Sequence, residues 1–282
     1  MPELPEVETI RAELEPQLTG RTIVGVRVYH DDLILGGHTR RAFSRGVRDR
    51  TFLHVGRRAK YLLFTLGRAG PTDEPERIIR VQLRMSGKFW LGATRPDPEE
   101  FRHPGIELRL DDGRVLFYDD TRRLGGFDLL TPAEWAVLES RIGPEPLASS
   151  FSAARFGERF AGSRAPIKNA LLDQRRIAGV GNIYASEALF RARVDPRRAG
   201  GSLDTEEVVR LHRAVRAVLR EALSWAGTTF RSYRAVNGRS GSFQSRLRVY
   251  GREDEACRRC GDPVERVVQA GRSTFFCPSC QS

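Results

Sequence analysis

The architecture of the N-terminal half of the chain is indicated by residues 106–118, IELRLDDGRVLFY. Ile106, Leu108 and Leu110 alternate with charged residues, which is the period of a half-buried strand. Asp112-Gly113 follows, and residues 115–118 are again apolar. Because Asp-Gly between two strand-like runs strongly favours a tight turn, we predict an antiparallel hairpin here.

Similar runs surround this hairpin and predict a larger antiparallel system. Residues 24–28 and 79–85 alternate with the same period, and residues 61–66 form a continuous apolar run typical of a buried strand. A helical pattern at 7–18 precedes them and stops at Gly20. We therefore predict one helix followed by an antiparallel sandwich or barrel.

The chain changes character at residues 143–146, Gly-Pro-Glu-Pro, where helical patterns replace strands. These patterns cover residues 151–160, 167–174, 181–190 and 204–225. In the last, apolar residues form one face, and Asp204 with Glu207 predicts a capping box at its start. Residues 228–241 are polar and without period, so we expect an exposed loop. The predicted class is α+β.

All four cysteines lie in the last 26 residues, as two Cys-x-x-Cys pairs separated by 16 residues. This spacing is typical of one structural Zn²⁺ held by four thiolates, with no open position for water. Strand-like runs between the pairs predict a hairpin. Zinc ribbons bind proteins as well as DNA, so the motif alone leaves the partner open. The predicted ligands are Cys257, Cys260, Cys277 and Cys280.

The composition indicates a polyanionic partner. The 282 residues include 47 Lys and Arg against 36 Asp and Glu, a net charge of +11. Such an excess favours nucleic acid first and an anionic membrane second. Apolar runs are too short to span a bilayer and no signal-peptide pattern is present, so we expect a cytoplasmic protein that does not engage membranes.

Three motifs together resemble the bacterial formamidopyrimidine-DNA glycosylase family: MPELPEVET at 1–9, GVGNIYASE at 179–187, and the cysteine spacing. The resemblance spans nearly the whole chain. It implies a catalytic β-sandwich domain at 1–145, a helix-two-turn-helix domain that binds DNA at 146–240, and a zinc finger at 241–282. It also implies that the protein binds damaged double-stranded DNA and works in base excision repair in bacteria, at the nucleoid. A monomer is the default expectation for the oligomeric state.

The resemblance assigns the chemistry to the N-terminus. Once Met1 is removed, Pro2 is a free secondary amine, and an α-amine titrates near 8, so a usable fraction is neutral. In the family this amine attacks the sugar C1′ as the base leaves, and the resulting iminium drives elimination of both phosphates. Glu3 is implied as the proton donor and acceptor. Glu6 is implied as a supporting carboxylate, and Lys60 as a strand-borne lysine at the phosphate beside the lesion.

DNA contacts are also implied by the resemblance. A flipped-out base leaves a hole in the duplex that side chains can fill. Position 124 departs from the family, because leucine replaces the usual phenylalanine, and Gln82 replaces a histidine. The residues implied to fill the hole are Met85, Arg122 and Leu124. Those implied to hold phosphates are Lys168, Asn182 and Arg272. Arg231 lies in the loop that would cover the flipped base.

Alternatives remain open from the residues alone. Met85 is equally compatible with a plain core position on an alternating strand. Because Leu124 and Gln82 depart from the family pattern, an endonuclease-VIII-like preference for oxidised pyrimidines over oxidised purines such as 8-oxoguanine stays open as an alternative. A non-catalytic zinc DNA-binding protein is a third interpretation, but binding alone needs neither Pro2 nor Glu3.

Overall fold

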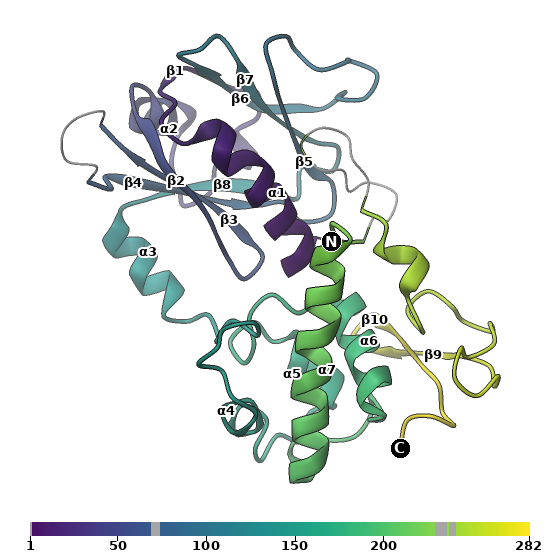
Figure 1. The fold of residues 1–282 in the computed structure, drawn as a ribbon. Coiled ribbons are helices and arrows are strands. Elements are labelled where there is room, and N and C mark those ends of the chain that lie inside the picture. The colour runs from purple at the N-terminus through teal and green to yellow at the C-terminus, as the bar shows by residue number, and fades with distance from the viewer. Residues whose placement is uncertain (1, 69–73, 229–235, 237–240) are drawn as a thin grey trace. The chain divides into compact units, whose positions relative to one another are not determined.

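Helices and antiparallel sheets make up the computed structural model, which describes residues 2–68, 74–228, 236 and 241–282 (Figure 1). The chain divides into two units, Met1–Ser140 with Ala226–Ser242 and Arg141–Trp225 with Phe243–Ser282. The described part of the chain holds no helix that is both long and apolar enough to cross a membrane.

The first unit is built on two four-stranded antiparallel sheets, ordered β1-β6-β7-β5 and β2-β3-β4-β8. The predicted hairpin is confirmed: Ile106 pairs with Tyr118 and Leu108 with Leu116. Its elements are α1 (Leu4–Leu18), β1 (Ile23–Val28), η1 (Asp31–Leu33), α2 (Arg40–Val47), β2 (Thr51–Arg58), β3 (Tyr61–Gly67), β4 (Arg77–Gln82), β5 (Gly87–Gly92), β6 (Pro104–Leu110), β7 (Val115–Asp120), β8 (Gly126–Leu130) and α3 (Pro132–Glu139).

The facing sides of the two sheets share one hydrophobic core, so the sandwich prediction is confirmed. Phe64, Phe89 and Phe127 lie at its centre, in edge-to-face contacts with ring centroids 6.0 and 6.2 Å apart. Helix α1 lies along β2 and β3 (Figure 1), and its apolar face, including Ile10 and Leu14, is fully buried in the same core. The N-terminus is thereby held against the sandwich.

Helices fill most of the second unit, as predicted. The 20-residue α7 begins with the expected capping box, in which Asp204 accepts from the Glu207 N–H at 2.8 Å. The two-stranded sheet β9-β10 is the predicted zinc hairpin. The elements are α4 (Ala153–Glu158), α5 (Ile167–Leu172), α6 (Asn182–Ala192), η2 (Gly200–Ser202), α7 (Thr205–Ser224), η3 (Phe243–Arg246), β9 (Glu265–Gln269) and β10 (Arg272–Phe276).

Candidate functional site

The N-terminal residues are fixed by the first turn of α1. Pro2 is buried directly ahead of the helix. Glu3 is the N-cap, and its N–H donates to Glu6 Oε2 at 2.8 Å, within a capping box. Both carboxylates are only 2% exposed. The positive end of the helix dipole lies at this point.

Glu6 and Glu13 anchor the segment that follows α7. The Thr228 N–H donates to Glu6 Oε1 at 2.7 Å, and the Val236 N–H donates to Glu13 Oε2 at 2.8 Å. Seven residues separate the two acids, so they share one face of α1. Glu6 thus uses one oxygen to cap its own helix and the other to hold Thr228. It is a positioning residue in this geometry.

Gly227 allows the backbone before Thr228 to approach the Glu6 carboxylate closely. Its φ is +79°, a conformation that other residues rarely adopt, and a Cβ there would lie 2.7 Å from Glu6 Oε1. Thr228 also pairs with Ser242 in an isolated antiparallel bridge, which closes the base of the segment. Arg231 lies between these two residues, outside the described residues.

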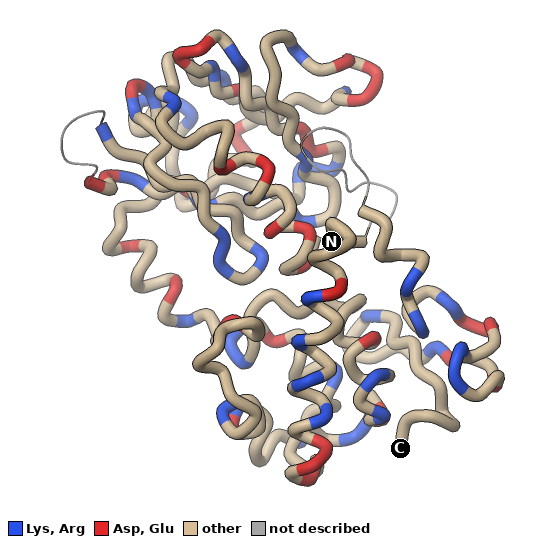
Figure 2. The backbone as a smooth tube through the Cα atoms, viewed as in Figure 1, with Lys and Arg blue, Asp and Glu red and all other residues tan. Residues whose placement is uncertain are grey.

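Lys60 does not lie on a strand as expected. It occupies, with Ala59, the two-residue turn between β2 and β3, where Ala59 has a φ of +54°. Arg57 ties this turn to α1, because it donates to Ala59 O at 2.9 Å and to Glu8 Oε2 at 2.8 Å. The turn is strongly basic (Figure 2). The correction has a simple cause: a tight hairpin places its two central residues in the turn, outside the strand ladder.

Met85 lies in a turn, and the core interpretation of this residue is wrong. The predicted strand 79–85 ends at Gln82, and Met85 is 39% exposed. The hydrogen bond from the Gly87 N–H to Leu83 O, at 3.0 Å, closes the turn that presents it. Leu124 is 52% exposed, and Arg122 is also exposed, in the loop between β7 and β8.

A fully buried carboxylate, that of Asp120, joins these two loops. Its Oδ1 accepts from the Ser86 hydroxyl at 2.5 Å, and its Oδ2 accepts from the Gly125 N–H at 2.8 Å. Tyr118 donates its hydroxyl to Oδ2 at 3.2 Å, and burial, reinforced by this carboxylate, raises the pKa of Tyr118. Ser86 and Gly125, which flank the exposed Met85 and Leu124, therefore both depend on this one acid. The sequence analysis missed Asp120, because only the fold reveals its partners.

Replacing Asp120 by Ala leaves several buried donors without an acceptor. Each such donor costs about 1–3 kcal/mol. We expect Asp120→Ala to lower the free energy of unfolding by about 3 kcal/mol and to weaken binding of a duplex with an abasic site. Asp128→Ala is the matched control, because Asp128 is a buried acid of the same sandwich that binds Arg80. Equal loss of DNA affinity in both variants, at equal stability, would contradict the assigned role.

In the second unit, the carbonyl oxygen of Ser273, in the zinc hairpin, accepts two side-chain hydrogen bonds. Lys168 Nζ and Asn182 Nδ2 both donate to Ser273 O at 2.9 Å, and Lys168 also donates to Thr274 Oγ1 at 2.7 Å. Lys168 is fully buried, so a direct phosphate contact, which the resemblance implied, does not fit. The structure shows Lys168 joining α5 to β10 instead.

Asn182 and Arg272 are both accessible to solvent. Asn182 begins α6, is partly exposed, and retains a second amide hydrogen besides the one given to Ser273. Arg272 is exposed at the start of β10, beside a turn in which Ala270 and Gly271 have φ of 47° and 71°. Positive φ at both central positions is typical of a type I′ turn, whose backbone twist matches that of the two flanking strands. The shared contact at Ser273 therefore fixes the side chain of Asn182 beside the strand that carries Arg272.

The four cysteines lie together as predicted. All four Sγ atoms lie within 4.8 Å of one another; Cys257 and Cys280 are 3.9 Å apart, and Cys260 and Cys277 are 3.5 Å apart. Tetrahedral zinc with Zn–S bonds of about 2.3 Å separates its sulfurs by about 3.8 Å. The cluster therefore fits one structural Zn²⁺ with all positions filled by thiolate.

Glu187 holds the zinc finger to α6. Its fully buried carboxylate accepts backbone N–H groups from Arg248 (3.0 and 2.9 Å), Val249 (3.0 Å) and Tyr250 (2.9 Å). We expect Glu187→Ala to lower the free energy of unfolding by about 3–5 kcal/mol, since these N–H groups lose their acceptor. Urea denaturation of the zinc-loaded protein measures this. The exposed Glu206 on α7 is the control position, and a Glu187→Ala loss as small as that of Glu206→Ala would contradict the anchoring role.

Comparison with known proteins covers all parts of the chain. The formamidopyrimidine-DNA glycosylase N-terminal domain matches residues 1–127, the H2TH domain of that glycosylase matches 142–234, and a zinc finger found in FPG and IleRS matches 254–282. The formamidopyrimidine-DNA glycosylases of Herpetosiphon aurantiacus and Chloroflexus aurantiacus are 43% and 44% identical. The first alignment covers 100% of both proteins, and the second covers 100% of this chain and 98% of the relative.

Solved structures indicate the same family as the sequence comparisons. The MutM (Fpg) protein of Thermus thermophilus superposes with a TM-score of 0.86 at 42% identity, over 99% of this chain and 98% of that one. A Lactococcus lactis Fpg mutant in complex with Fapy-dG-containing DNA gives a TM-score of 0.88 at 33% identity, over 99% of both chains. The chain therefore belongs to the formamidopyrimidine-DNA glycosylase family.

Proposed function

We propose that this protein is a DNA glycosylase and AP lyase that removes oxidised purines, chiefly 8-oxoguanine and formamidopyrimidines, in bacterial base excision repair. The observation that carries the proposal is the buried Pro2 ahead of the N-cap Glu3 in the first turn of α1. A DNA-binding protein needs neither group in that place. The same proposal places the protein in the bacterial cytoplasm, on DNA.

In the first step, the Pro2 nitrogen, freed by removal of Met1, forms a bond to C1′ as the bond from C1′ to the damaged base breaks. The departing base takes a proton from Glu3. The C1′–O4′ bond then breaks, the Pro2 nitrogen loses its proton and O4′ gains one, which leaves an open sugar joined to Pro2 as an iminium.

The iminium then acts as an electron sink for strand cleavage. Loss of a proton from C2′ expels the 3′ phosphate, and a second elimination expels the 5′ phosphate. Water finally releases the sugar remnant and restores the amine. Lys60, in the basic turn beside α1, is proposed to hold the phosphate next to the lesion and to assist proton transfer.

DNA would be held by Asn182 and Arg272 through phosphates, which position a duplex without reading its sequence. Met85, Arg122 and Leu124 are proposed to fill the hole left by the flipped base. The exposure of Met85 and Leu124, on loops joined by Asp120, supports this proposal because both apolar side chains are accessible to a base stack. Leu124 provides apolar bulk without an aromatic face.

Borohydride trapping on a duplex with 8-oxoguanine opposite cytosine tests the function. We expect a covalent adduct that mass spectrometry locates at Pro2. A parallel duplex with an oxidised pyrimidine tests the endonuclease-VIII-like alternative, which predicts the stronger adduct there. No adduct on either duplex, with Met1 removed and binding intact, would overturn the catalytic proposal.

A further inference from the structure

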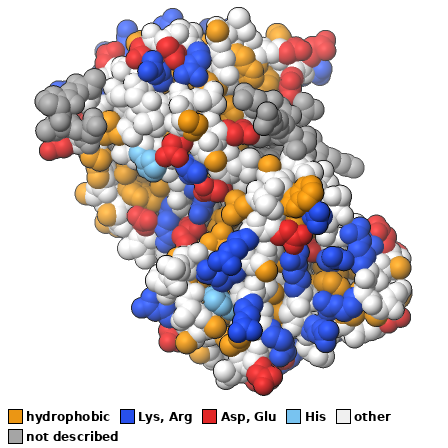
Figure 3. All heavy atoms as spheres, in the orientation of Figure 1, with side chains coloured by type: hydrophobic (Ala, Val, Ile, Leu, Met, Phe, Trp, Pro, Cys, Tyr) orange, Lys and Arg blue, Asp and Glu red, His pale blue; other side chains and the backbone are white. Residues whose placement is uncertain are grey.

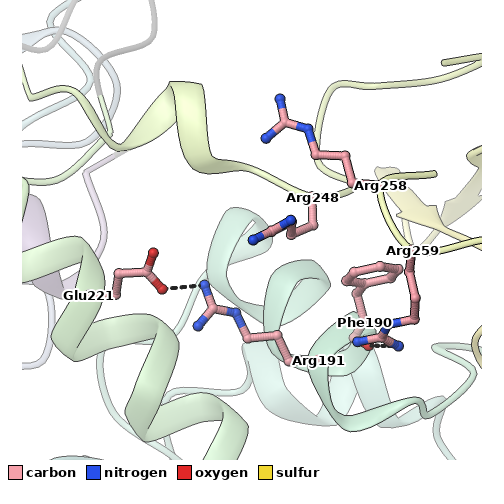
Figure 4. A pocket seen from close by; sticks show the side chains of 6 residues that line it. All are labelled: Phe190, Arg191, Glu221, Arg248, Arg258 and Arg259. Carbon is pink, nitrogen blue, oxygen red and sulfur yellow. Dashed lines mark hydrogen bonds and ion pairs between the residues drawn. The ribbon is translucent and has the colours of Figure 1, made fainter. Parts of the chain in front are cut away.

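The second unit carries an arginine-lined groove whose lining includes none of the residues proposed to touch DNA. One hollow of about 550 Å³ is lined by Phe190, Arg191, Glu221, Arg248, Arg258 and Arg259 (Figure 4). An adjoining hollow of about 350 Å³ shares Glu221, Arg248 and Arg258 with it and adds Trp225 and Arg246. We name the two together the arginine groove. Figure 3 shows Lys and Arg side chains gathered on this face of the second unit.

The charge of the groove is strongly unbalanced. Five arginines surround one carboxylate, that of Glu221, which already pairs with Arg191 at 2.5 Å and with Arg246 at 3.6 Å. Among the described residues, the guanidinium of Arg248 has no hydrogen bond or ion pair, and Figure 4 shows it over the hollow. The groove therefore offers uncompensated positive charge to an anionic ligand.

The other arginines are held in place with donors to spare. Arg258 Nη1 donates to Ser245 O at 3.1 Å. Arg259 lies 4.5 Å over the ring of Phe190 and donates to the carbonyl of that residue at 3.3 Å. A guanidinium has five N–H donors in a planar fork, so each can still bind a carboxylate through two hydrogen bonds. Little side-chain entropy remains to be lost on binding.

Nucleic acid fits this groove less well than a peptide. Duplex DNA is read when protein elements enter its own grooves, whereas the arginine groove would itself receive the ligand. Single strands bind by stacking bases on aromatic faces. Here one face of Phe190 is covered by Arg259 and one face of Trp225 by Arg246, at 4.5 and 4.0 Å. Arginine clusters with aromatic walls are typical of acidic-peptide recognition and of interface hot spots.

The position of the groove also separates it from the DNA contacts. Asn182 begins α6, whereas Arg191 lies near the end of that helix, about 14 Å along its axis. We propose that the arginine groove docks an acidic peptide segment of a partner protein, with carboxylates on Arg248 and Arg258 and an apolar side chain toward Trp225. This docking does not depend on the catalytic proposal.

Fluorescence anisotropy with the full-length, zinc-loaded protein tests the proposal. The probe is a fluorescein-labelled peptide, Asp-Glu-Asp-Phe-Glu-Asp, and the companion probe carries Asn and Gln in place of its acids. We expect saturable binding of the acidic probe only. We expect the double variant Arg248→Ala with Arg258→Ala to weaken that binding at least about tenfold. Duplex affinity should change by less than about twofold, because the groove lies apart from the phosphate contacts.

The control is the double variant Arg141→Ala with Arg213→Ala, which removes the same charge from exposed positions outside the groove. It should bind the acidic probe as the unmodified protein does. Equal loss in the two double variants would reduce the effect to net charge and overturn the proposal. A loss of duplex affinity as large as that of peptide affinity would reassign the groove to DNA.

Discussion

Acylation of the Pro2 nitrogen will leave the protein able to bind damaged duplex but unable to excise a base or cut the strand. An amide nitrogen has no available lone pair, so it cannot attack C1′, and elimination has no iminium to drive it. Loss of an activated nucleophile costs roughly 10⁴- to 10⁶-fold in rate. A chain with one glycine ahead of Pro2, in place of Met1, provides the variant, and single-turnover cleavage of an 8-oxoguanine duplex provides the measurement.

The matched control is the processed protein with Pro2 free, confirmed by mass spectrometry of the intact chain. Both forms should bind a duplex with an abasic-site analogue with similar affinity. The added glycine must leave α1 in place, and equal thermal unfolding of the two forms would establish this. Cleavage at an undiminished rate by the acylated form would refute the role of Pro2.

Loss of one zinc ligand is expected to have the second large effect. Cys257→Ser removes a thiolate from a closed four-sulfur site, and structural zinc binding contributes about 10–16 kcal/mol to folding in isolated fingers. The zinc hairpin formed by β9 and β10 is small and has little apolar core of its own, so it should unfold without metal. We expect zinc content to fall below one per chain and duplex affinity to fall about 100-fold or more, because Arg272 loses its fixed position.

A spectrophotometric zinc assay and duplex titrations measure both effects. The control, Ser279→Ala, changes a side chain between Cys277 and Cys280 and should retain zinc and affinity. Circular dichroism on Cys257→Ser should show that the helical content of the second unit persists. Full duplex affinity in the zinc-free variant would contradict the finger assignment.

The parts of the fold encoded by local patterns were predictable from the sequence. Asp112-Gly113 fixes its hairpin, the spacing of four cysteines fixes the zinc cluster, and Asp204 with Glu207 marks the start of α7. In contrast, β8 is buried at all five positions, so it has no alternation to detect. Helix α3 had a usable signal, the capping box of Thr131 and Glu134, which the sequence analysis missed.

The site was only partly predictable for a different reason. Motif resemblance predicted roles for Pro2, Glu3 and Arg272, but it could not show which polar atoms meet across the fold. Lys168 was expected at a phosphate, and instead its ammonium is buried against residues more than a hundred positions away. Asp120 went unnoticed because its partners come from three separate loops and strands. Such contacts depend on tertiary structure, and no local period encodes them.

The way α1 holds the segment between Thr228 and Ser242 has a consequence for how substrate preference can evolve. Both anchors on the segment are backbone N–H groups, and both acceptors, Glu6 and Glu13, belong to α1. Any residue except proline supplies the same N–H. A substitution other than proline therefore leaves the backbone donor at each of these two attachment points, and both stay in register on the helix that carries Pro2. A change of substrate preference through this segment would not require the reaction centre to be rebuilt.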